Sequence, residues 1–336
     1  MKRKMEYDEG VSFYGAQKVM GTYERSNNKL LFLRNFNNWV KSSLINDYAL
    51  PNMSVFDLCC GKGGDLFKWK LARCGHYVGL DLFEQQIEEA VKRFMSNGGQ
   101  KMFPAIFIKN ADVSSDKLDV DALLPKQIVF DIVSCQMSMH YAFKNEGSVR
   151  NLLRAVTCRL TPGGHFIGTV PDANALLKKF AESDKFGNKF YSIESLEKWQ
   201  ENSFTMKYQF YLEDAVGYKE TSGELVHIPE YLVIFDKFQH IAKEFDLELI
   251  GHWNFKDFEG SHTKTFNGRK FHARKVKGRQ EDTEKDIDKQ KEIIYMYSAF
   301  CFRKKGKIEK LHNDCGYCGC QTDPLLIDAK CGITSW

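Results

Sequence analysis

Residues 55–69 read VFDLCCGKGGDLFKW, and this stretch decides the fold class. The apolar run over 55–59 has the length and composition of a buried strand, and the glycines at 61, 63 and 64 indicate a turn. Residues 65–74 then follow a helical pattern. A strand, a glycine-rich turn and a helix in this order are typical of the first unit of a doubly wound α/β sheet, in which the turn holds a nucleotide-like ligand.

The same alternation of strands and helices continues along the chain. Apolar runs predict further strands over 76–82, 105–109, 129–135 and 165–170, and helical spacing predicts helices over 28–46, 84–95 and 147–160, with a turn at 161–164. The run EIIYMYSAFCFRK, residues 292–304, has a β-like composition and is expected to add a late strand. The pattern predicts an α/β fold with a doubly wound, mostly parallel sheet of the Rossmann-like type.

Composition excludes several classes of protein. Of the 336 residues, 43% are hydrophobic and 13% aromatic, which is enough for a sizeable core and argues against a disordered chain. The sequence contains no stretch of about eighteen uncharged apolar residues, so no membrane span is expected. The basic start MKRKMEYDEG is not followed by an apolar segment, so no signal peptide is expected. We expect a soluble intracellular protein.

The carboxylates around the turn separate two classes of ligand. Asp57 precedes the turn and Asp65 follows it, and both would repel the pyrophosphate of a dinucleotide. S-adenosylmethionine carries positive charge on its amino group and its sulfonium, so it tolerates them. Asp81 and Asp112 end the second and third predicted strands, where carboxylates can accept the ribose hydroxyls and the adenine amino group. The pattern favours S-adenosylmethionine over NAD, and the alternative for each aspartate is a loop or helix-cap role.

The basic residues are clustered, although the net charge is only +4. GRKFHARKVKGR, residues 268–279, is followed by the acidic stretch EDTEKDIDK, residues 281–289. Two interpretations stay open for the basic stretch: a solvated surface loop, or a loop that contacts the phosphates of a nucleic acid.

The ten cysteines are expected to be reduced thiols, because no secretion signal is present. The C-terminal cysteines have a C-x-x-C-x-C spacing with a fourth sulfur further on, and four thiolates can bind zinc tetrahedrally. This weak candidate metal site consists of Cys315, Cys318, Cys320 and Cys331. An unstructured tail without a metal is the alternative.

Five segments of the chain form a more specific pattern when they are taken in order. They read FLRNFNNWVKSSLI, DLCCGKGGDLFKWK, VGLDLFEQQI, SCQMSMHYAF and LTPGGHFIGTVP. Together they resemble the eukaryotic mRNA cap guanine-N7 methyltransferases over roughly residues 12–304. The resemblance implies an N-terminal arm over 1–27 and a methyltransferase domain over 28–304, with cap-binding insertions and a loop within about 171–290. A Cys-rich C-terminal tail over 305–336 has no counterpart in the family.

The resemblance also implies the site residues. Those expected to bind S-adenosylmethionine are Lys41, Asp57, Cys59, Gly61, Asp81, Asp112 and Gln136. Those expected to bind the cap are Asn37, Lys62, Arg93, His140, Tyr141, Pro171, Glu230 and Tyr297. The chemistry fits, because a carboxylate can accept the guanine N1–H and exocyclic amine while aromatic rings stack on the base. Two positions depart from the family: Cys59 stands where glycine is common, and Met137 where an aromatic residue is more usual. At Cys59 we expect reduced affinity for the cofactor at most.

The implied reaction transfers a methyl group from S-adenosylmethionine to N7 of the 5′ cap guanine of mRNA. N7 carries a lone pair and no proton, so we expect no catalytic acid or base, and only residues that position the reactants. The family's role implies a nuclear location, a 5′-capped RNA substrate, RNA polymerase II or other capping components as partners, and a monomeric catalytic unit. Two alternatives remain: a methyltransferase for a small molecule, and an inactive RNA-binding capping scaffold, which Cys59 would favour.

Overall fold

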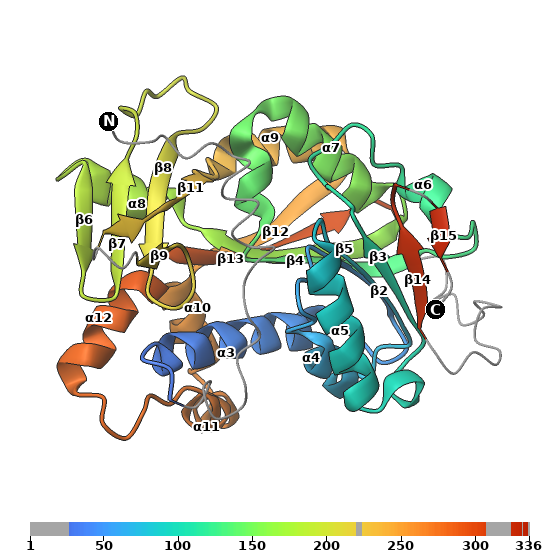
Figure 1. Ribbon diagram of the computed structural model, residues 1–336, viewed down its shortest axis with the longest axis horizontal. Helices are drawn as coiled ribbons and strands as arrows, with labels where there is room; N and C mark the ends of the chain where they lie inside the picture. The colour runs from blue at the N-terminus through green and yellow to red at the C-terminus, as the bar shows by residue number, and fades with distance from the viewer. Residues whose placement is uncertain (1–26, 220–223, 307–323, 331, 335–336) are drawn as a thin grey trace. The chain divides into compact units, whose positions relative to one another are not determined.

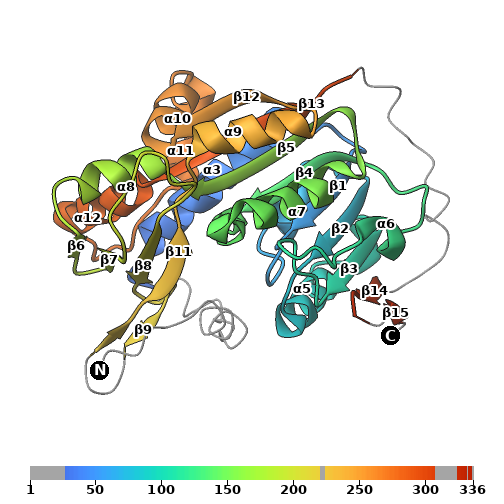
Figure 2. The same ribbon diagram turned by 90° about the horizontal axis from the view of Figure 1, so that it is seen from above.

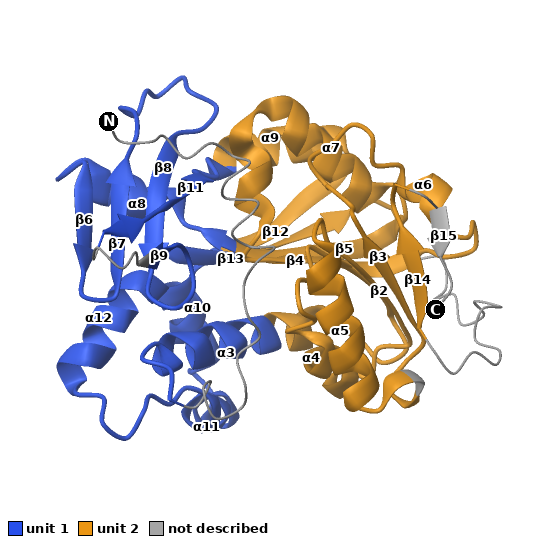
Figure 3. Cartoon of the chain, viewed as in Figure 1, with its two compact units in different colours: residues 1–43, 170–235, 253–299 blue, residues 44–169, 236–252, 300–336 orange. Residues whose placement is uncertain are grey.

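The computed structural model of the protein describes residues 27–219, 224–306, 324–330 and 332–334 (Figure 1). Two compact units make up the chain (Figure 3). Unit 1 consists of the described residues of 1–43, 170–235 and 253–299, and unit 2 of those of 44–169, 236–252 and 300–336. None of the helices in these ranges is long and apolar enough to cross a membrane.

The main sheet has nine strands in the order β12-β13-β5-β4-β1-β2-β3-β14-β15. Its five central strands are parallel to one another: β1 (Ser54–Leu58), β2 (His76–Leu80), β3 (Ala105–Lys109), β4 (Phe130–Gln136) and β5 (Leu160–Pro171). β12 (Leu247–Asn254) and β13 (Tyr297–Lys304) complete one side. The strand and sheet predictions are confirmed, and the expected fold class with them.

Helices cover both faces of this sheet, as a doubly wound fold requires. α4 (Leu66–Leu71) and α5 (Glu84–Ser96) lie on one face, and α7 (Glu146–Thr157) and α9 (Phe235–Glu244) on the other (Figure 1, Figure 2). The short α6 (Val120–Leu123) and the 3₁₀ turns η1 (Gly99–Lys101) and η2 (Met139–Lys144) lie in the connections. The Asn145 side chain caps α7 by accepting the N–H of Ser148 at 2.9 Å. β2 is buried at all five residues, which is why central strands read as continuous apolar runs.

Unit 1 contains a second, antiparallel sheet in the order β11-β8-β7-β6. Its strands are β6 (Lys185–Asn188), β7 (Tyr191–Ser195), β8 (Lys207–Leu212) and β11 (Ile228–Tyr231), and a small hairpin pairs β9 (Tyr218–Lys219) with β10 (Leu225–Val226). The helices of this unit are α8 (Ala173–Phe180), α10 (Phe255–His262), α11 (Phe266–Lys275), α12 (Glu284–Ile294) and most of α3 (Leu31–Tyr48).

Two local predictions are wrong, and a third is right except for its starting residue. Residues 161–164 form no turn before a strand, because β5 already starts at Leu160 and a register shift against β4 accommodates the extra residues. Residues 268–275 of the basic stretch belong to a helix, α11, and only residues 276–279 lie outside it. The predicted late strand is confirmed as β13, although it begins only at Tyr297, since the capping box of Thr283 and Asp286 starts a helix that continues to Ile294.

The C-terminal segment adds two strands that the sequence pattern did not reveal. β14 (Leu325–Asp328) pairs in parallel with β3, and β15 (Gly332–Thr334) pairs antiparallel with β14. The four cysteines of the candidate metal site, Cys315, Cys318, Cys320 and Cys331, lie outside the described residues, so that site stays a prediction. Within the described ranges no cluster of three or more His, Cys, Asp or Glu side chains is arranged to hold a metal ion.

Candidate active site

The glycine-rich turn between β1 and α4 follows a left-handed path. Cys59, Gly61 and Gly63 have φ angles of 54°, 52° and 66°, values that residues with a side chain rarely adopt. A Cβ on Gly63 would lie 3.3 Å from the Cα of Ala90 on α5, so glycine also allows the turn to pack closely on that helix. Cys59 therefore adopts a backbone conformation that suits the glycine expected there.

Asp81, directly after β2, holds the turn in place. Its carboxylate accepts the backbone N–H of Gly61 at 2.8 Å and that of Phe83 at 3.0 Å. The residue is buried, and this burial raises its pKa in spite of the two bonds. Each carboxylate oxygen has a second lone pair, so Asp81 can shape the turn and still offer acceptors to a ribose.

Asp57 lies inside β1, one residue before the end of the strand and ahead of the turn, as expected. The Tyr77 hydroxyl donates to its Oδ2 at 3.0 Å. Burial, and then the charge of Asp57, raise the pKa of Tyr77 well above its usual value. The phenol thus remains a donor, which fixes the orientation of the buried carboxylate beside the turn.

Asp112 follows β3 and lines a polar cleft of about 510 Å³ together with the first residues of α7. Its Oδ1 accepts the N–H and the hydroxyl of Ser114 at 2.8 and 2.7 Å. The N–H of Ala111 donates to the carbonyl of Asp81 at 3.1 Å. This bond joins the two loops that carry the predicted ribose and adenine contacts.

The added strand β14 supports the loop of Asp112 from the side. Asp328 accepts Nδ2 of Asn110 at 3.1 Å, and its carboxylate lies 3.7 Å from Nζ of Lys109. The N–H of Ala329 donates to the carbonyl of Lys109 at 3.0 Å. These contacts fix Asn110 at a left-handed φ of 59°, two residues before Asp112.

Gln136 ends β4, and its side-chain amide is held by its neighbours. Its Nε2 donates to Oγ of Ser134, and its Oε1 accepts the hydroxyl of Thr169, both at 3.1 Å. Met137 follows with a left-handed φ of 59°, and the next turn, η2, carries His140 and Tyr141. Their ring centroids lie 4.1 Å apart, with His140 buried and Tyr141 half-buried.

Lys62 on the turn and Arg93 on α5 influence each other electrostatically. Burial lowers the pKa of Lys62, and the charge of Arg93 lowers it further, against an opposing effect of Glu89. Two cations that disfavour each other's charge are a suitable environment for an anion, because a phosphate would relieve the repulsion. This agrees with the expected contacts to the cap phosphates.

In unit 1, α3 presents Asn37 and Lys41 one helical turn apart, so both project from the same side of the helix. Oδ1 of Asn37 is buried, and no described group donates a hydrogen bond to it. An acceptor without a partner is costly when it is buried. Asn37 is therefore suited to receive a hydroxyl of a ligand, in agreement with the expected ribose contact.

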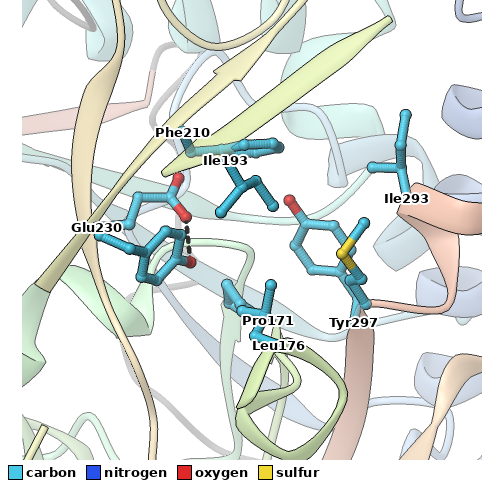
Figure 4. A pocket seen from close by; sticks show the side chains of 9 residues that line it. Pro171, Leu176, Ile193, Phe210, Glu230, Ile293 and Tyr297 are labelled. Carbon is cyan, nitrogen blue, oxygen red and sulfur yellow. Dashed lines mark hydrogen bonds between the residues drawn. The ribbon is translucent and has the colours of Figure 1, made fainter. Parts of the chain in front are cut away.

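The clearest site of unit 1 is a pocket lined by three predicted cap residues (Figure 4). Pro171 ends β5, Glu230 lies on β11 and Tyr297 begins β13. The hydroxyl of Tyr208, directly opposite on β8, donates to Oε2 of Glu230 at 2.6 Å. The remaining lining side chains are apolar: Leu176, Ile193, Phe210, Ile293 and Met296. The result is one buried carboxylate among aromatic and aliphatic walls.

This pocket is narrow. Its water-accessible volume is about 10 Å³, room for roughly one water molecule. A purine can enter only if the lining side chains move apart. Glu230 and Tyr208 are both almost fully buried, at 3% and 1% exposure, so the carboxylate is desolvated before any ligand arrives.

The structure thus groups the predicted residues by unit. Pro171, Glu230 and Tyr297 share one pocket, and Asn37 and Lys41 share one face of α3. The turn and loop residues of unit 2 gather at the carboxyl edge of the parallel strands. Tyr208 was not predicted. Tyr208, Phe210 and Leu212 recur at every second position of β8 and are buried, and this period of two is the sequence signal that could have marked Tyr208 as facing inward.

A doubly wound sheet with this turn and an acidic residue after the second strand is the arrangement expected of an S-adenosylmethionine-dependent methyltransferase. A solved structure agrees at the level of fold: the CcbJ methyltransferase from Streptomyces caelestis matches with a TM-score of 0.51 at 11% sequence identity, over 80% of this chain and 90% of its own. This likeness shows the fold, and the expected cofactor, S-adenosylmethionine, is confirmed by the family to which the chain belongs.

Residues 2–305 match the family described as "mRNA (guanine-N(7))-methyltransferase domain". mRNA cap guanine-N(7) methyltransferase 1 from Oryza sativa subsp. japonica is 38% identical over 88% of this chain and 80% of its own length. The mRNA cap guanine-N(7) methyltransferase from Schizosaccharomyces pombe is 35% identical over 88% and 81%. The chain belongs to the mRNA cap guanine-N7 methyltransferase family, as its motifs predicted, and its substrate class is capped RNA. β14 and β15 lie beyond the part that matches the family.

Proposed function

We propose that this chain methylates N7 of the 5′ cap guanine of mRNA by positioning the reactants, with no residue acting as acid or base. S-adenosylmethionine, when bound, supplies a methyl group that is already activated by the positive charge on sulfur. The residues of the chain have to hold N7 in line with that group and exclude water. Correct placement alone can contribute about 7–11 kcal/mol to such a reaction.

The observation that carries the proposal is the pocket of Pro171, Glu230 and Tyr297. Guanine presents two donors on one edge, N1–H and the exocyclic amine, and a buried carboxylate can accept both. Tyr208 holds one oxygen of Glu230 and so fixes the plane of the carboxylate. The apolar and aromatic walls match the faces of a base.

In unit 2 we assign the cofactor to Asp57, Cys59, Gly61, Asp81, Asp112 and Gln136. In unit 1 we assign Lys41 of α3 to the carboxylate of the cofactor, to which its ammonium group can donate in an ion pair. Asp81 has acceptors for the ribose, and Asp112, fixed by Ser114, has acceptors for the adenine amino group. For the cap we assign Lys62 and Arg93 to the phosphates, Asn37 to the ribose, and His140 and Tyr141 to the base. We further propose that the chain acts in the nucleus as a monomer, beside RNA polymerase II or other capping components.

The test incubates the purified chain with labelled S-adenosylmethionine and GpppA-capped RNA, digests the RNA and resolves the cap. We expect label in m7GpppA. Binding of S-adenosylmethionine without transfer would indicate a different substrate, such as a small molecule. No binding at all would leave an RNA-binding scaffold as the function.

A further inference from the structure

Helix α11 carries most of a strongly basic segment. Residues 260–280 contain seven Lys and Arg residues and no Asp or Glu. The chain as a whole has 48 basic and 44 acidic residues. Without this segment it would have 41 basic and 44 acidic residues, and its net charge would be −3. The positive charge of the protein is thus concentrated on one short helix and its flanks.

The helix is anchored through one narrow stripe. Gly268, His272 and Val276 follow one another at four-residue spacing, which places them on the same side. A Cβ on Gly268 would collide with the carbonyl oxygen of His262, so glycine permits a close approach there. The ring of His272 lies 4.7 Å from that of Trp39 on α3, with an interplanar angle of 83°, and its Nε2 lies 2.8 Å from Oε1 of Glu259.

Glu259 is itself well held on α10. Its Oε2 accepts the hydroxyl of Tyr295 at 2.9 Å. Burial alone would raise the pKa of Glu259, but His272 and Tyr295 lower it overall, so the carboxylate is charged at neutral pH. Behind α11, Nδ2 of Asn35 on α3 also donates to the carbonyl of Lys277 at 2.6 Å. The contacts of His272 therefore anchor α11, although none of its residues is fully buried, and the Asn35 bond anchors the chain two residues after it.

The opposite side of α11 presents its cations to solvent. Lys270 and Arg274 are four residues apart and point away from His272. Lys275, the last residue of the helix, and Lys277, two residues beyond its end, are also exposed. Within the described part of the chain none of these four side chains forms an ion pair with a carboxylate. Elsewhere in unit 1 exposed lysines do have such partners, as Lys185 has in Glu194 and Lys29 in Glu213.

We propose that this basic face, consisting of Lys270, Arg274, Lys275 and Lys277, binds the phosphates of the RNA chain beyond the cap. The inference rests on the proposed function, because it adds a contact for the body of the same capped RNA. A fixed helix with solvated cations that form no ion pairs with carboxylates suits a polyanion, since binding releases the counterions that condense on it. This face is not expected to distinguish between RNA sequences, because contacts to phosphates carry no sequence information.

The test compares the full chain with a triple variant, Lys270→Ala, Arg274→Ala and Lys277→Ala. A control variant with the same loss of charge, Lys101→Ala, Lys117→Ala and Lys126→Ala, removes exposed lysines of unit 2. Two readouts are measured. One is fluorescence anisotropy of an uncapped RNA of about 20 nucleotides, longer than most single-strand binding sites. The other is the kcat/KM for the dinucleotide GpppA.

We expect the RNA Kd of the wild-type chain to rise with salt, with a slope of about −0.7 in log affinity per phosphate contact. Three contacts predict a loss of affinity of about twentyfold between roughly 50 and 200 mM salt. The α11 variant should bind more weakly at low salt and lose most of this dependence, whereas the control variant keeps it. Methylation of GpppA should be the same in all three proteins.

RNA binding by the α11 variant equal to that of the control variant overturns the inference. Since this readout needs no methyl transfer, it is decisive even if GpppA is not a substrate. Failure of the wild-type chain to methylate GpppA and capped RNA would instead count against the proposed function. Equal melting temperatures of the three proteins exclude a general loss of fold.

Discussion

Glu230→Gln tests the guanine pocket most directly. The substitution keeps the size of the side chain but replaces one acceptor oxygen by an NH₂ donor. A hydrogen bond to a charged group contributes about 1.5–3 kcal/mol, and a buried donor that faces another donor costs about 1–3 kcal/mol. Because Glu230 is only 3% exposed, water cannot compensate for the mismatch.

The expected loss of transition-state stabilisation is about 2–4 kcal/mol, which corresponds to a fall in kcat/KM of roughly 30- to 1,000-fold. Tyr208→Phe removes the 2.6 Å bond that orients the carboxylate and leaves both its oxygens in place. We expect a smaller effect there, about tenfold, since one bond of about 1.5 kcal/mol is lost.

The assay measures kcat/KM on GpppA-capped RNA and, separately, the Kd for S-adenosylmethionine. Glu284→Gln makes the same chemical change at an exposed position of α12 and serves as the control. The reasoning requires an unchanged Kd for the cofactor and a loss confined to the capped substrate. Wild-type kcat/KM in the Glu230 variant would remove this residue from the site.

Three further changes test the rest of the chain. Asp81→Ala should raise the Kd for S-adenosylmethionine more than tenfold, because two buried hydrogen bonds that shape the turn are lost; an unchanged calorimetric Kd would exclude the residue. Cys59→Gly places glycine at a φ of 54°, so the Kd should fall, and an equal or higher Kd would show that the thiol does not crowd the ligand. Asp328→Asn should lower the Tm at pH 7 by about 2–4 °C. A backbone N–H, Asn110 and Lys109 lower the pKa of Asp328 in the fold, so this stabilisation exists above its unfolded pKa of about 3.9 and should vanish as the pH falls further. A difference in Tm that persists at pH 2 would contradict this reasoning.

The strands of the parallel sheet could be predicted because burial on both faces leaves an unbroken apolar run. β3 shows this most clearly, since the predicted and observed bounds are both Ala105–Lys109. The turn after β1 was equally readable, because its left-handed backbone requires glycines at 61 and 63. In both cases the local sequence contains the whole physical cause.

The failures have causes that lie elsewhere in the chain. β14 is a strand only because it forms hydrogen bonds with the edge of β3, which lies about 220 positions earlier in the chain. Neither segment by itself indicates the register that pairs Leu325 with Ile106. α11 reads as a polar loop because its few inward contacts, above all His272 on Trp39, come from α3 and α10. Nothing in the segment HIPEYLVIF marks Glu230, and only the resemblance to the family identified it.

The narrowness of the guanine pocket has a consequence for affinity. Since its water-accessible volume is about 10 Å³, binding must first separate side chains such as Tyr297 and Met296 that now fill it. The free energy of this opening is subtracted from the contacts with guanine, so the observed affinity for the cap is weaker than those contacts alone would give. The proposed contacts beyond the cap would then gain importance, because phosphates on α11 would add affinity without requiring any rearrangement of the pocket. A reaction that needs no general base can in this way depend on two modest interactions, one that orients the cap guanine and one that retains the RNA.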